Sequence, residues 1–190
     1  MQFWIIIAVA AALALYAIVV FNRLVRLRQM VNEAWSGIDV QLKRRSDLVP
    51  NLVETVKGYA AHERGVLTEV TELRGAARAV PQDDVAGRAK AEGALSAGLG
   101  KLFALAESYP DLKASGNFLE LQKELSALED DLQMARRYYN GAVRNLNVRV
   151  QSFPSSLIAH ACGFAAREFF ELADAGERSA PQVAFNPAPT

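Results

Sequence analysis

The chain begins with nineteen consecutive uncharged residues, FWIIIAVAAALALYAIVVF, from residue 3 to residue 21. A helix of this length rises about 28 Å, close to the hydrocarbon thickness of a bilayer. A cleaved signal peptide is the alternative, and the small residues at 10–14 would permit cleavage. However, no basic residue precedes the run, which is also longer than the roughly 7–15 apolar residues of a signal core. The pattern therefore predicts a transmembrane anchor over residues 1–22.

Residues 22–45 repeat apolar positions at steps of three and four, which predicts an amphipathic helix that continues the anchor. Ser46 and Pro50 then interrupt the pattern. Either Ser46 caps a new helix with Pro50 in its first turn, or the helix runs through and kinks at Pro50. The cap-like order of the two residues favours a break, with the next helix over about 49–79.

A turn is expected at 81–84, with Asp83 or Asp84 capping a helix over about 85–108. The clearest periodicity follows, because apolar residues from 118 to 150 form an almost uninterrupted heptad seam. Asn117 and Glu120 have the spacing of a capping box at its start. Phe153-Pro154 ends this helix. A shorter amphipathic helix over about 156–172 and an extended tail over 173–190 complete the prediction.

No stretch shows the alternation typical of strands, and short loops between long helices favour antiparallel neighbours. The expected fold is all-α: an N-terminal transmembrane helix continues into an up-and-down antiparallel four-helix bundle. A short C-terminal helix and an extended tail follow. We expect three parts, namely the anchor at 1–22, the bundle at 23–152, and an aromatic helix and tail at 153–190.

The composition argues against several kinds of chemistry. Lys plus Arg and Asp plus Glu both number 21, so the net charge is zero, which argues against nucleic-acid binding. One cysteine and two histidines cannot build a multi-histidine or four-cysteine metal site. Glu129, followed by Asp130, Asp131, Arg136 and Arg137, is interpreted as a source of interhelical ion pairs. We therefore expect no catalytic residue, metal or cofactor.

Basic residues cluster after the anchor. Residues 22–45 carry six basic and two acidic side chains, and none precedes the anchor. The positive-inside rule then places the N-terminus outside and the C-terminal part in the cytoplasm. Arg23, Arg26 and Arg28 are candidates for binding anionic lipid head groups. A second cluster, Lys43, Arg44 and Arg45, lies too far along the helix for the same surface. It is either solvated charge or an interaction surface for a partner.

Five of the nine phenylalanines fall in the last 38 residues: Phe153, Phe164, Phe169, Phe170 and Phe185. Two interpretations remain open. The segment folds back and caps its own bundle, or it presents a docking surface to another copy or to a partner, as exposed apolar patches often do.

Two long blocks near the start, AWSGIDVQLKRR at 34–45 and DLVPNLVETVKGY at 47–59, resemble the LemA family. AESYPDLKA at 106–114, ARRYYN at 135–140, Phe153-Pro154 and PQVAF at 181–185 resemble later blocks of the family, in the same order. The resemblance covers nearly the whole chain, and Gly37 and Ser46 are its small departures.

The resemblance implies a bacterial membrane-anchored helical protein with a cytoplasmic bundle and no established enzymatic activity. Related proteins are associated with magnetosome membranes or with membrane-protease quality control. We expect a non-enzymatic scaffold of the bacterial inner membrane that contacts lipids and self-associates through its cytoplasmic helices. The alternative is an adaptor or regulator of a membrane protease or another membrane enzyme, bound as a membrane-protein partner.

Overall fold

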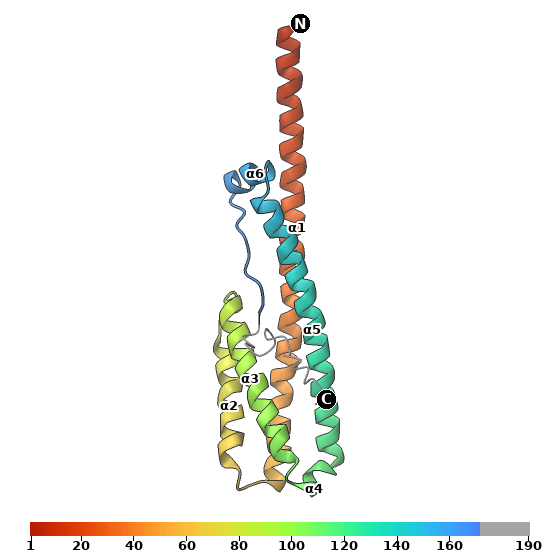
Figure 1. The fold of residues 1–190 in the computed structure, drawn as a ribbon, viewed down its shortest axis with the longest axis vertical. Coiled ribbons are helices and arrows are strands. Elements are labelled where there is room, and N and C mark those ends of the chain that lie inside the picture. Colours follow the sequence, from red (N-terminus) through yellow and green to blue (C-terminus); the bar gives the residue numbers. More distant parts are fainter. Residues whose placement is uncertain (172–190) are drawn as a thin grey trace, which may run out of the picture.

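The computed structural model describes residues 1–171 and consists of helices joined by short connections, with no strand in that range (Figure 1). The helices are α1 (Gln2–Tyr59), α2 (Arg64–Ala79), α3 (Val85–Ala106), α4 (Pro110–Lys113), α5 (Gly116–Gln151) and α6 (Ser155–Ala161). The expectation of an all-α chain is confirmed. Residues 172–190, which include the expected tail and Phe185, lie outside the described residues.

Helix α1 runs without interruption for 58 residues, so the favoured break at Ser46 is wrong. Pro50 lies inside the helix, as the alternative allowed. The residues around it, Val49, Leu52 and Val56, are buried in the core. The chain instead turns after Tyr59, so the single helix expected over 49–79 is divided between α1 and α2.

The end of the molecule farthest from the N-terminus is an up-and-down four-helix arrangement of α1, α2, α3 and α5 (Figure 1). Its core cluster draws large apolar residues from each of these helices, including Leu52, Val70, Leu102 and Leu125. The short helix α4 contributes the fully buried Leu112. The short connections between consecutive helices explain why they are antiparallel neighbours.

Towards the N-terminus, α2 and α3 stop at the turn that joins them, and α5 is the long helix that continues beside α1 (Figure 1). A second core cluster forms here, with Ile38, Ala34 and Leu24 of α1 packed against Tyr139 and Leu146 of α5. The heptad seam of α5 thus lines both cores. Beyond Val20, α1 has no packing partner within residues 1–171, and its side chains are exposed or half-buried.

Helix α6 ends at Ala161, so the helix expected to reach residue 172 is too long. Gly163 has a φ of 71° and reverses the chain, while the Phe164 N–H donates to the Ala159 carbonyl at 2.9 Å. This left-handed glycine with its backward bond is a standard helix stop. Residues 164–171, here named the C-terminal segment, are not helical and run back along α1 and α5 (Figure 1).

Two capping predictions had different outcomes. Asp84 caps α3 by accepting a hydrogen bond from the Gly87 N–H at 2.7 Å, as expected. The capping box at Asn117 is wrong, because α5 begins at Gly116 after Ser115, and no side chain caps it.

Candidate functional site

The C-terminal segment is held against α5 by two asparagines that bind its backbone. Asn147 donates from Nδ2 to the Arg167 carbonyl and accepts from the Arg167 N–H with Oδ1, both at 2.8 Å. Asn140 does the same with Phe170, at 3.2 and 2.9 Å. Seven helical residues rise about 10.5 Å and three extended residues span about 10 Å, so the two spacings agree.

Tyr139 adds a third backbone contact from α5. Its hydroxyl donates to the Glu168 carbonyl at 3.0 Å. Burial raises the pKa of Tyr139; nearby Arg167 lowers it and Glu168 raises it, so the hydroxyl keeps its proton and remains a donor. The Trp35 ring of α1 lies 5.3 Å from the Tyr139 ring and 5.7 Å from that of Phe170. The segment therefore closes an aromatic cluster between α1 and α5.

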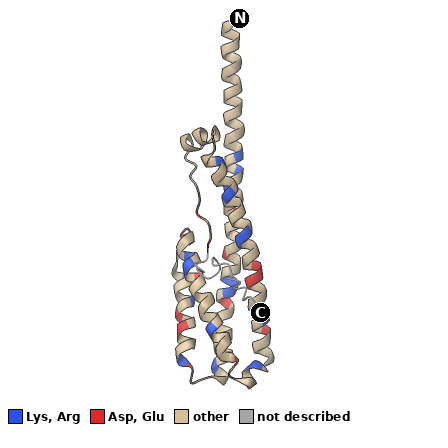
Figure 2. Ribbon diagram, viewed as in Figure 1, with Lys and Arg blue, Asp and Glu red and all other residues tan. Residues whose placement is uncertain are grey.

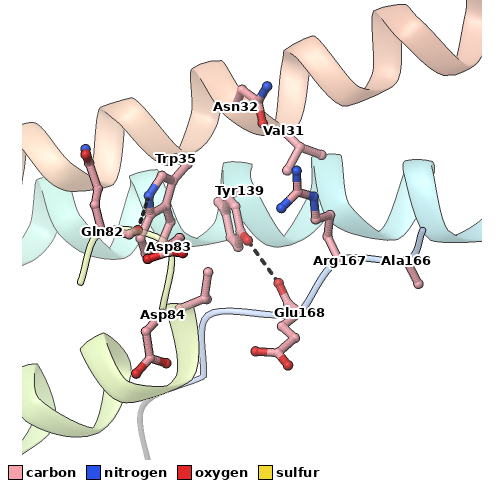
Figure 3. A pocket seen from close by; sticks show the side chains of 11 residues that line it. Val31, Asn32, Trp35, Gln82, Asp83, Asp84, Tyr139, Ala166, Arg167 and Glu168 are labelled. Atoms are coloured by element: carbon pink, nitrogen blue, oxygen red, sulfur yellow. Dashed lines mark hydrogen bonds between the residues drawn. The ribbon is translucent and has the colours of Figure 1, made fainter. Parts of the chain in front are cut away.

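Beside this cluster lies a cleft of about 640 Å³, bounded by α1, α5, the α2–α3 turn and the C-terminal segment (Figure 3). Trp35 Nε1 donates to the Gln82 carbonyl at 3.0 Å and ties the turn to α1. Asp83, Asp84, Arg167 and Glu168 also line the cleft.

The lining combines ring edges with carboxylates and one guanidinium, so the cleft can bind a polar or charged group. Within residues 1–171, no group of three or more His, Cys, Asp or Glu side chains could hold a metal ion.

A buried charge network joins the α1–α5 pair to α3. Arg45 Nη1 lies 3.5 Å from Glu129 Oε2 and 3.8 Å from Glu92 Oε2, and Arg45 Nη2 donates to Ser96 Oγ at 2.7 Å. Arg45 is 6% exposed and Glu92 is 4% exposed. Burial raises the pKa of Glu92, whereas Arg45 and Arg88 lower it. These contacts confirm that Glu129 forms an interhelical ion pair.

Glu92 was not among the residues predicted from the sequence, although a signal was present. Glu92 precedes Leu95, Leu99 and Leu102 at steps of three, four and three, so it occupies the apolar face of α3. A carboxylate in the core stripe of a helix requires a buried partner. Arg45, the last residue of the second basic cluster, is that partner.

The structure separates the basic candidates. Arg23, Arg26 and Arg28 are exposed on α1 beside the uncharged span, and Lys43 and Arg44 are exposed farther along. Arg45 does not join them, because its side chain points into the bundle and is paired there. The prediction that Arg45 belongs to an interaction surface is therefore wrong.

The aromatic candidates divide as well. Phe164 and Phe170 are buried in the chain's own core cluster, which agrees with the interpretation that the segment folds back. The prediction that these two residues belong to an exposed docking surface is wrong. Phe153 is 81% exposed and Phe169 is 39% exposed, so both face outward.

The chain is similar in sequence to several known proteins. The chain is 24% identical over 181 residues to the magnetosome protein MamQ 1 of Paramagnetospirillum magneticum and to the magnetosome protein MamQ of Magnetospirillum gryphiswaldense. These alignments cover 83% of this chain and 66% of each relative. Protein LemA of Metamycoplasma hominis is 27% identical over 138 residues, covering 73% of this chain and 63% of that protein.

The chain thus spans just under two thirds of the length of these curated relatives. A family model matches residues 34–185, which include α2 to α6, the buried charge network and both asparagine contacts. On this match, the chain belongs to the LemA family.

Proposed function

We propose that this protein is a single-pass, membrane-anchored, non-enzymatic scaffold that self-associates through its cytoplasmic helices. The observation that carries the proposal is the continuity of α1, which extends beyond the bundle as an unpaired apolar helix. Its N-terminal part is long and apolar enough to cross a membrane. Exposed apolar side chains in a continuous run are stable only in lipid or in another apolar environment.

Self-association is supported by an apolar surface on the outer side of α5. Met134, Tyr138 and Val148 are all more than half exposed. Steps of four and ten residues place them within one face of the helix. We name these three residues the outer stripe. Large apolar side chains in such a line are typical of helix-to-helix contacts between chains.

The mass of the full chain in detergent tests self-association. The scaffold proposal expects large homogeneous particles for the parent, and much smaller particles for the double variant Met134→Gln, Tyr138→Gln. Gln133→Ala, at an exposed neighbouring position of α5, is the matched control and should leave the mass unchanged. A parent chain that remains a monomer or dimer would contradict the scaffold.

The alternative is an adaptor or regulator of a membrane enzyme, such as a membrane protease. The 640 Å³ cleft and the exposed Lys43 and Arg44 support it, since both offer polar contacts to a partner. Under this proposal the chain is a monomer or dimer in detergent. It is retained with a membrane enzyme on capture from native membranes, and Lys43→Glu, Arg44→Glu weakens that retention.

We further propose that the protein lies in the bacterial inner membrane with its N-terminus outside and its helical domain in the cytoplasm. The basic residues Arg23, Arg26 and Arg28 directly after the span support this orientation. Their contact with anionic head groups would hold the end of the span at the lipid surface. A fluorescent-protein fusion after Thr190 should be fluorescent, and a phosphatase fusion there should be inactive. The opposite pair of results would contradict the orientation.

A further inference from the structure

Two large apolar side chains stand exposed where α5 turns into α6. Phe153 is 81% exposed and Leu157 is 65% exposed. Neither belongs to a core cluster, although Ser155 and Ala159 between and after them are buried. We name Phe153 and Leu157 the apolar corner.

The apolar corner is fixed at the level where the bare part of α1 begins. Ala159 of α6 packs in one core cluster with Val20 and Leu24 of α1. Directly after α6, the Phe164 ring lies 5.8 Å from the Phe21 ring. Figure 1 shows α6 beside α1 at the point above which α1 stands alone. The corner therefore sits level with the end of the uncharged span.

Basic side chains lie at the same level along α1. The Arg28 guanidinium lies 5.0 Å from the Phe164 ring centre, and Arg23 and Arg26 are exposed nearby on α1. Figure 2 shows that the span above is free of charge and that the first basic residues lie next to α6. Apolar side chains beside arginines, at the level where a span ends, are typical of segments that lie in the membrane interface.

We propose that the apolar corner inserts into the head-group and acyl boundary of the leaflet on the C-terminal side of α1. The occupant is lipid rather than protein, because the corner lies level with the end of the uncharged span, which the proposed anchor puts at the membrane surface. The inference rests on the proposed anchor. It adds a second attachment, on α5 and α6, that holds the α1–α5 pair in one orientation relative to the membrane.

The test places an environment-sensitive probe at the corner of the full chain. Cys162 is exposed at the end of α6, so Cys162→Ser provides a background without thiols. Phe153→Cys carries the probe. Leu119→Cys carries it in the matched control, because Leu119 is 49% exposed at the opposite end of α5. Both proteins are reconstituted into vesicles of phosphatidylethanolamine and phosphatidylglycerol that contain lipids with a quencher near the head group.

The proposal expects a blue-shifted probe at 153 that the lipid quencher dims at least about twofold more than the probe at 119. Alkaline carbonate removes proteins that do not span the membrane. If the protein stays in the vesicles but the probe at 153 behaves as the one at 119, the proposal for the apolar corner is wrong and the proposed anchor is unaffected. A blue-shifted but unquenched probe would assign the corner to a protein contact and also overturn it. Release of the protein by carbonate would overturn the anchor and, with it, the corner.

Leu157→Cys provides a second position should Phe153→Cys fail to fold, as judged by its helical circular dichroism. It is expected to give the same quenching as position 153, because Leu157 is also largely exposed and lies in α6, four residues after Phe153. An unquenched probe at 157 would count against the proposal in the same way.

Discussion

The Arg74 side chain of α2 donates from Nε to the main-chain carbonyl of Ser46 in α1 at 2.6 Å. Ser46 is four residues before Pro50, so its carbonyl is the one that the missing proline N–H leaves without a helical partner. A buried carbonyl without a partner costs about 1–3 kcal/mol. Arg74 supplies the missing donor and thereby allows α1 to continue through Pro50.

Arg74→Ala should therefore lower the free energy of unfolding by about 1–2 kcal/mol, since it leaves the Ser46 carbonyl unpaired. Pro50→Ala restores a helical N–H and should recover much of this loss in the double variant. Arg78→Ala, at an exposed position one turn later, is the control. The measurement is thermal unfolding of the full chain in detergent. If the double variant is no more stable than Arg74→Ala alone, Arg74 does not compensate for the missing N–H of Pro50.

Removing the buried carboxylate should change the dependence of stability on pH. Burial raises the pKa of Glu92 above the ordinary value of 4.5, to which the unfolded chain is close. Between these two values the folded state binds more protons than the unfolded state, so the contribution of Glu92 to stability falls as pH rises through that window. Glu92→Gln stays neutral and should flatten this fall, with stability at neutral pH equal to or above that of the parent.

The unfolding temperature of the full chain in detergent, followed from about pH 4 to pH 8, measures the effect. Glu124→Gln, at an exposed position of α5, serves as the reference. If Glu92→Gln and Glu124→Gln lose stability with rising pH to the same extent as the parent, Glu92 is not the group responsible.

The asparagine contacts predict a local rather than a global effect. Asn147→Ala removes both hydrogen bonds to the Arg167 backbone and should release the C-terminal segment. At about 1 kcal/mol for each bond, amide exchange at Arg167 and Phe170 should accelerate roughly tenfold or more. Exchange in the α2–α3 pair should stay unchanged. Asn145→Ala, exposed two residues earlier, is the matched control, and equal acceleration in both variants would contradict the assignment.

Two glycines of α3 should respond differently to alanine. A Cβ at Gly98 would lie 2.7 Å from Leu73 Cδ1 of α2, whereas a Cβ at Gly100 meets nothing within 4 Å. Gly100→Ala should stabilise the chain by up to about 1 kcal/mol through helix propensity. Gly98→Ala should be about 1–2 kcal/mol less favourable, because Leu73 must move. Thermal unfolding compares the two, and equal effects would exclude a close α2–α3 approach at Gly98.

Local pattern was sufficient to predict an all-helical chain, the long helix α5 and the uncharged run. The heptad seam of α5 repeats at the spacing of a helix, and the apolar run of residues 3–21 has the length that a helix needs to cross a bilayer. Both features depend only on neighbours along the chain. Asp84 was recognisable for the same reason, because a cap acts within one turn. The family resemblance likewise rested on contiguous blocks, and a family model matches residues 34–185.

Packing between distant segments decided the rest. Pro50 favours a break when only its neighbours are considered, and the contact between Arg74 and Ser46 reverses that preference. The sequence grouped Arg45 with the exposed basic residues Lys43 and Arg44. In the structure its side chain is buried between Glu92 of α3 and Glu129 of α5. The sequence pattern predicted helix for the C-terminal segment, but hydrogen bonds from Asn140 and Asn147 hold its backbone in a non-helical path along α5. In each case the deciding partner is at least twenty residues away, and only folding brings it within hydrogen-bond or ion-pair distance.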